Sequence, residues 1–164
     1  MRTKSAIAID AGVAPWGLPG TAPAARAELQ LGYGPLELGL GGGAILTSAK
    51  TDTNGVGAEA SLAFAAIALR ATPWRRLTLG TSFEIGKLDA QGVGVGLPRQ
   101  ESLQWQAIGG SLRVGGPRWG KVRTAVTAEV AVPLANLALQ VNGSTRFETG
   151  PIVRLWLGAV LPFL

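Results

Sequence analysis

Apolar residues recur at every second position along most of the chain, which is the period of a β-strand rather than of an α-helix. Between Leu77 and Ile85, for example, Leu79 and Phe83 share the parity of the two ends, whereas Glu84 has the other. Such runs predict eight strands, at about residues 6 to 13, 25 to 33, 36 to 41, 58 to 71, 77 to 85, 103 to 114, 122 to 132 and 147 to 163. The pattern changes parity near Ala65-Ala66 and at Gly109-Gly110, which predicts a bulge or slip at both places.

Composition supports a membrane-embedded β-structure. Hydrophobic residues make up 47% of the 164 residues and charged residues only 15%, against roughly 25% in an ordinary soluble domain. This apolar content excludes a disordered chain. The longest apolar run, Ala60 to Leu69, is about half the roughly 20 residues that a membrane-spanning helix needs. A helical membrane protein is therefore excluded.

The absence of Cys and His removes many kinds of chemistry. Disulfide frameworks, thiolate metal sites and every catalytic triad or metal cage that needs an imidazole are unavailable. We therefore expect no cofactor, no metal site and no catalytic residue, and we expect that the chain is not an enzyme. The net charge of +5 does not come with a basic face carrying aromatic residues, so we expect no nucleic-acid binding either.

The predicted connections alternate in length. The links at about residues 14 to 24, 47 to 56, 87 to 101 and 135 to 145 are long, whereas those at 34 to 35, 72 to 75 and 115 to 120 are short. Long loops on one rim and tight turns on the other are typical of outer-membrane barrels, whose short turns are periplasmic. The sequence therefore predicts one closed, up-and-down, antiparallel transmembrane β-barrel domain of eight strands over residues 1–164.

The placement of aromatic residues indicates that the apolar face points outward. One predicted girdle, at the short-turn end, contains Tyr33, Trp74, Trp119 and Phe163, and the other, at the long-loop end, contains Trp16, Trp105 and Phe147. Membrane–water interfaces select such girdles around an aliphatic belt. A soluble lipocalin-like ligand-binding barrel, with its apolar face inward, is the alternative that strand parity alone leaves open.

The opposite face carries small and polar residues with single charges. Charges inside a narrow lumen must pair, because an unpartnered buried charge costs several kcal/mol. We predict a lumen charge network of Arg26, Glu28, Glu59, Glu84, Arg113, Arg123, Glu129, Glu148 and Arg154. Three further charged residues have the same parity: Asp10, Glu37 and Arg146.

These features resemble the small eight-stranded outer-membrane barrels, such as the transmembrane domain of outer-membrane protein A and outer-membrane protein X. The segment from Gly158 to Phe163 looks like the C-terminal targeting signal of that class, with Gly158 followed by the outward residues Leu161 and Phe163. It departs from the family pattern at Leu164, which follows the Phe, and at Trp156, where a polar residue is usual. The resemblance implies a location in the bacterial outer membrane and contact with its assembly machinery.

Function is predicted from this architecture. We expect an integral outer-membrane protein with a structural or anchoring role, whose lumen is plugged by Arg/Glu ion pairs. A narrow pore or conduit for small solutes is the alternative, although eight strands leave an interior only just wide enough for side chains. The expected partner is the lipid bilayer, and because a closed barrel has no free strand edge, we expect a monomer.

Cations gather near the predicted short-turn rim with no acid among them: Arg2, Lys4, Arg70, Arg75, Arg76, Arg118 and Lys121. Basic residues beside an anionic membrane surface each gain about 1 kcal/mol. We therefore expect this rim to contact anionic lipid headgroups of the periplasmic leaflet.

Overall fold

The computed structural model describes residues 3–163, apart from 54, 95–99, 136–137 and 142–143, and gives no side-chain description for 3, 138–141 and 144–147. The strands are β1 (Thr3–Trp16), β2 (Ala22–Tyr33), β3 (Leu36–Thr51), β4 (Gly57–Trp74), β5 (Leu77–Val93), β6 (Gln100–Trp119), β7 (Val122–Pro133), β8 (Ala138–Val141), β9 (Ser144–Glu148) and β10 (Ile152–Pro162). No helix in this part of the chain is long and apolar enough to cross a membrane.

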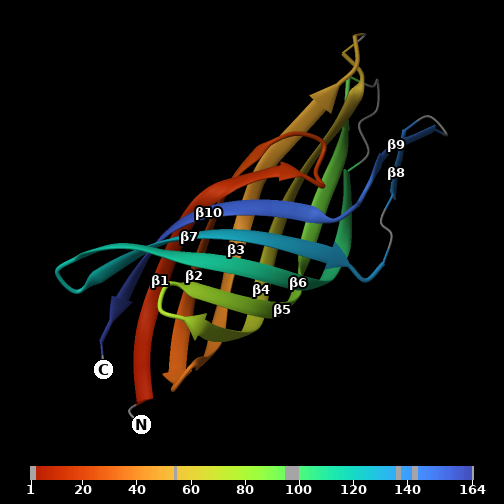
Figure 1. The fold of residues 1–164 in the computed structure, drawn as a ribbon. Coiled ribbons are helices and arrows are strands. Elements are labelled where there is room, and N and C mark those ends of the chain that lie inside the picture. Colours follow the sequence, from red (N-terminus) through yellow and green to blue (C-terminus); the bar gives the residue numbers. More distant parts are fainter. Residues whose placement is uncertain (1–2, 54, 95–99, 136–137, 142–143, 164) are drawn as a thin grey trace.

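Eight of these strands form a closed antiparallel barrel, in the order β1-β10-β7-β6-β5-β4-β3-β2 (Figure 1). The fold class predicted from the sequence is therefore confirmed. Strand β1 begins and β10 ends at the same rim, and their ladder closes the ring. Two of the tight turns at this rim use Gly34 and Gly120, whose φ angles of 60° and 59° favour glycine.

The remaining two strands, β8 and β9, pair only with each other and form a hairpin beside the barrel (Figure 1). The prediction that the last strand begins at Phe147 is wrong, because residues 144–148 belong to this hairpin and β10 begins at Ile152. The three other predicted long links, at about 14 to 24, 47 to 56 and 87 to 101, are shorter in the structure. For example, β5 extends to Val93 and β6 already begins at Gln100.

An aliphatic belt covers the outside of the barrel. Its exposed side chains include Ile9 on β1, Leu40 on β3, Ile67 on β4, Val126 on β7 and Leu157 on β10. A soluble barrel would place such residues inside, whereas here they alternate with buried charged side chains. The belt therefore has the composition of a lipid-facing surface.

Strands β4, β5 and β6 extend beyond this belt at the long-loop end. There the outward side chains are polar and the inward ones are apolar, the reverse of the arrangement within the belt. On β6, Ile108 and Leu112 face outward within the belt, but Gln104 and Gln106 occupy the same face above it. On the inner face, buried apolar side chains replace charges above the belt; they include Ile45, Leu62, Leu88, Trp105 and Ile152. We call this inner group the apolar layer.

The bulges or slips predicted at the two changes of parity do not occur. The ladders run without interruption through Ala65-Ala66 and through Gly109-Gly110. The apolar residues change parity because the surroundings of the strand change: within the belt the apolar side chains face outward, whereas above it they pack inward and polar ones face outward. Irregularities lie elsewhere, between Ile45 and Ser48 and between Gly115 and Arg118.

Candidate functional site

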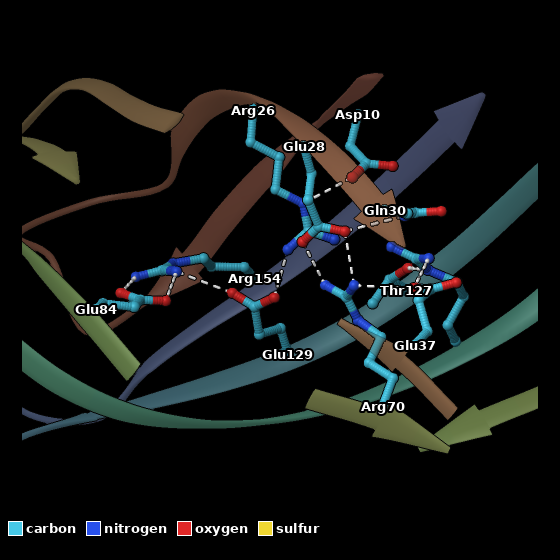
Figure 2. A network of polar contacts seen from close by, with 11 residues as sticks. Asp10, Arg26, Glu28, Gln30, Glu37, Arg70, Glu84, Thr127, Glu129 and Arg154 are labelled. Carbon is cyan, nitrogen blue, oxygen red and sulfur yellow. Dashed lines mark hydrogen bonds and ion pairs between the residues drawn. The ribbon is translucent and has the colours of Figure 1, made fainter. Parts of the chain in front are cut away.

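The lumen within the belt is filled by two chains of ion pairs (Figure 2). In the first, Arg154 forms a bidentate pair with Glu84, with Nη1–Oε1 and Nη2–Oε2 distances of 2.5 and 2.8 Å. Its Nη1 also donates to Glu129 Oε1 at 2.8 Å. Glu129 Oε2 accepts from Arg26 Nη1 at 2.5 Å, and Arg26 Nε donates to Asp10 Oδ2 at 2.6 Å. All five side chains are buried.

The second chain lies nearer the short turns. Arg70 forms a bidentate pair with Glu28, in which both N–O distances are 2.6 Å. Arg70 Nη1 also donates to Glu37 Oε1 at 3.0 Å, and the same oxygen lies 3.5 Å from Arg113 Nη1. Gln30 Nε2 donates to Glu28 Oε1 at 2.9 Å. Most of these side chains form an ion pair with a residue on a strand that is not adjacent to their own in the sheet. The network therefore connects opposite parts of the barrel wall across the lumen.

Aromatic rings join the first ion-pair chain to the apolar layer. The Arg154 guanidinium lies over the Phe64 ring at 4.4 Å, and that of Arg26 lies over the Trp156 ring at 4.6 Å, both within the range of cation–π attraction. Trp105 Nε1 donates to Glu84 Oε2 at 3.1 Å. Charges and apolar layer thus form one packed interior.

Little open space remains between the charged side chains. The cavity lined by Arg26, Glu28, Arg70, Glu84 and Glu129 has a volume of about 20 Å³. This is close to the space that a single water molecule occupies. No group of acidic side chains in the described part of the chain is arranged to hold a metal ion.

Six residues of the predicted lumen network lie in these two chains: Arg26, Glu28, Glu84, Arg113, Glu129 and Arg154. Three others do not. Glu59 lies above the belt, where it accepts from Gln91. Arg123 is exposed at the short-turn end, and Glu148 is exposed at the end of β9, in the β8–β9 hairpin. The side chain of Arg146 is outside the described residues.

Arg70 is the network residue that sequence reasoning missed. Its position just before the predicted turn at residues 72 to 75 assigned it to the basic rim, but Arg70 is buried in the lumen with Glu28 and Glu37. Parity could have found it, because Arg70 alternates with Ile67 and Leu69, which face outward in the belt.

Most of the predicted girdle residues are exposed on the outer surface: Trp16, Tyr33, Trp74, Trp119 and Phe163. Trp105 is not among them, because it lies fully buried in the apolar layer. The side chain of Phe147 is outside the described residues. In the predicted targeting segment, Leu161 faces outward, whereas Gly158 faces the lumen beside Asp10.

Four of the predicted rim cations line the mouth of the barrel. Two overlapping cavities of about 510 and 470 Å³ open there, and Arg75 and Arg118 contribute to both. Lys4 lines the first and Arg76 the second, whereas Lys121 is exposed and Arg2 is outside the described residues. We call these two cavities together the mouth cavity.

No protein-family model matches this sequence, and no curated protein matches it. Solved structures do match. A major outer membrane protein from Thermus thermophilus is 12% identical with a TM-score of 0.67, and the match covers 99% of this chain and 100% of that one. The attachment invasion locus protein of Yersinia pestis, solved with the heparin analogue sucrose octasulfate, is 9% identical with a TM-score of 0.60, at 99% and 100% coverage.

Neisserial surface protein A gives a third match, at 11% identity and a TM-score of 0.57, again covering 99% of this chain and 100% of that one. Identities this low establish a common fold. The chain therefore has the fold of the small eight-stranded outer-membrane β-barrel proteins.

Proposed function

We propose that this chain is an integral outer-membrane protein that serves as a structural element or anchor, with a lumen plugged by Arg/Glu ion pairs. The observation that carries the proposal is the pairing of Arg154 with Glu84 and Glu129 beneath the apolar layer. An ion crossing the lumen would have to break these buried pairs, at a cost of several kcal/mol. The aliphatic belt supports residence in a bilayer, and the fold supports the outer membrane.

Planar-bilayer recording tests the plug. Purified chain is inserted into bilayers, and insertion is verified by heat-modified gel mobility on vesicles made from the same lipids. We expect no steady unit conductance from the inserted barrel. Regular, single-sized conductance steps from the original chain, whose size changes when Arg154 is replaced, would favour the alternative, a narrow solute pore.

We also propose that cations at the short-turn rim contact anionic headgroups of the periplasmic leaflet. The exposure of Lys121 and the clustering of Arg75, Arg76 and Arg118 support this contact. Replacing all four with Gln should weaken insertion into vesicles containing phosphatidylglycerol, and should leave insertion into phosphatidylcholine vesicles unchanged. Equal insertion into both lipids by the variant and the original chain would exclude the contact.

A further inference from the structure

The mouth cavity is strongly basic. Its lining contains six cations, namely Lys4, Arg75, Arg76, Arg113, Arg118 and Arg123. Among the described residues, the only acid in the lining is Glu37, which already pairs with Arg70 and Arg113. The described part of the mouth thus carries far more positive charge than its own acids balance.

Arg113, in the wall of this cavity, is paired less closely than Arg70 and Arg154, and unlike Arg26 it lines the mouth cavity. Arg70 and Arg154 each hold a carboxylate with two nitrogens. Arg113 donates through Nε to Thr127 at 3.3 Å, and its Nη1 lies 3.5 Å from a Glu37 oxygen that Arg70 also uses.

The second terminal nitrogen of Arg113, Nη2, is buried and has no hydrogen-bond partner among the described residues. Only 7% of the residue is exposed. A buried guanidinium with incomplete pairing is destabilising, and an added anion would relieve the deficit.

Two further arginines that line this cavity, Arg118 and Arg123, have no acid in the described part of the lining to balance their charge apart from Glu37. Arg118 on β6 lies directly opposite Arg123 on β7 in the strand register. Like charges in this arrangement repel each other and destabilise the strand pair. Arg118 Nε donates to the Gly120 carbonyl oxygen, which leaves the rest of its guanidinium fork for another acceptor.

We propose that the mouth cavity binds a phosphate-bearing anion, held by Arg118 and Arg123 at the entrance and by Arg113 farther inside. A ligand with several anionic oxygens suits several guanidinium forks, because each fork can donate two parallel hydrogen bonds. The cavity volume is in the range of small-molecule sites. The phosphate belongs either to a soluble molecule or to a lipid headgroup, and the proposal does not depend on whether the lumen conducts.

Calorimetry with inorganic pyrophosphate tests the soluble source. The full chain is folded in a zwitterionic, phosphate-free detergent, and titrated beside R118Q/R123Q and beside the control K50Q/K87Q, which removes two cations outside the mouth cavity. We expect saturable binding by the original chain and the control, weakened about tenfold or more in R118Q/R123Q and by added salt. Circular dichroism and heat-modified gel mobility verify that all three chains are folded.

Native mass spectrometry tests the lipid source. The same three chains are extracted from vesicles of phosphatidylcholine and phosphatidylglycerol in equal amounts, and the retained phosphatidylglycerol is counted. Retention that is lost only in R118Q/R123Q would identify a headgroup phosphate. The proposal is overturned if neither pyrophosphate nor phosphatidylglycerol binds, or if R118Q/R123Q binds as well as the original chain.

Discussion

Gly158 on β10 lies directly opposite Asp10 on β1, and a Cβ atom added at Gly158 would overlap the Asp10 carboxylate. The absence of a side chain at Gly158 thus leaves room for Asp10 to reach Arg26. Gly158 therefore has a packing role in addition to the targeting role that the sequence analysis predicts for the C-terminal segment.

Replacing Gly158 with Ala should destabilise the folded barrel by about 1–3 kcal/mol, because the new methyl group displaces Asp10 from Arg26. Urea unfolding of the purified chain in micelles measures this loss apart from targeting. The double variant Asp10→Ala/Gly158→Ala should lose less than the sum of the two single changes. A single Gly158→Ala variant with unchanged stability in micelles would show that the packing role is wrong.

Removing one partner of the Arg154–Glu84 pair should reduce the free energy of unfolding by more than the Gly158→Ala change does. Glu84→Gln leaves the buried guanidinium with only Glu129, and we expect a loss of about 3–5 kcal/mol in the free energy of unfolding. The double variant Glu84→Gln/Arg154→Met should be less destabilised than the two single variants added together. Denaturant titration followed by tryptophan fluorescence measures all of them.

The exposed pair of Lys87 and Asp89 provides the control for that comparison. Their N–O distance is 3.0 Å, but Lys87 is 62% exposed. Lys87→Gln should therefore change the free energy of unfolding by less than about 1 kcal/mol. If Lys87→Gln costs as much as Glu84→Gln, burial does not determine the strength of the lumen pairs.

The hydrogen bond between Trp105 and Glu84 should be measurable by itself. Trp105→Phe keeps an aromatic ring in the apolar layer but removes the donor to Glu84 Oε2, which should cost about 1–3 kcal/mol. The same change at the exposed Trp119 should cost about 0.5 kcal/mol or less. Equal effects at both positions in urea titrations would contradict the inward placement of Trp105.

The exchange of environments along β6 predicts a depth-dependent effect of charge. Leu112→Arg places a cation in the belt and should destabilise the barrel in lipid vesicles by about 2–4 kcal/mol. Gln104→Arg, on the same face of the same strand but above the belt, should change stability by about 0–1 kcal/mol. Comparable losses at both positions would show that the belt extends to Gln104.

The eight barrel strands and the outward belt were predictable because alternation with a period of two reports directly on a sheet with two unlike faces. The inward position of Trp105 was not, because apolar residues change parity for two different reasons. A bulge shifts the backbone, so that the side chains that follow it change face. At the rim of the belt the strand is not shifted, but the side chains that face outward below the rim are apolar and those that face outward above it are polar. The sequence pattern alone does not distinguish these cases, and choosing the bulge placed Trp105 on the outer face instead of the inner one.

The partners of the lumen charges lay beyond sequence reasoning for a different reason. Which charges meet across the lumen depends on strand tilt and stagger, which alternation does not report. Arg123 and Glu148 have the parity of lumen residues, yet Arg123 lies too close to the short turns and Glu148 belongs to the separate hairpin. Parity predicts a face, whereas depth along the barrel determines whether a charge finds a partner.

The bidentate pair of Arg154 and Glu84 joins residues 70 positions apart in the chain, on strands that are not neighbours. Such a pair is absent from every hairpin and forms only once β5, β6, β7 and β10 lie side by side in one sheet. A chain that entered the bilayer one strand at a time would carry Arg154 into hydrocarbon without Glu84, at a cost of several kcal/mol. The order of folding events is therefore constrained: we expect Glu84 to neutralise Arg154 only after β5, β6, β7 and β10 have joined into one curved sheet.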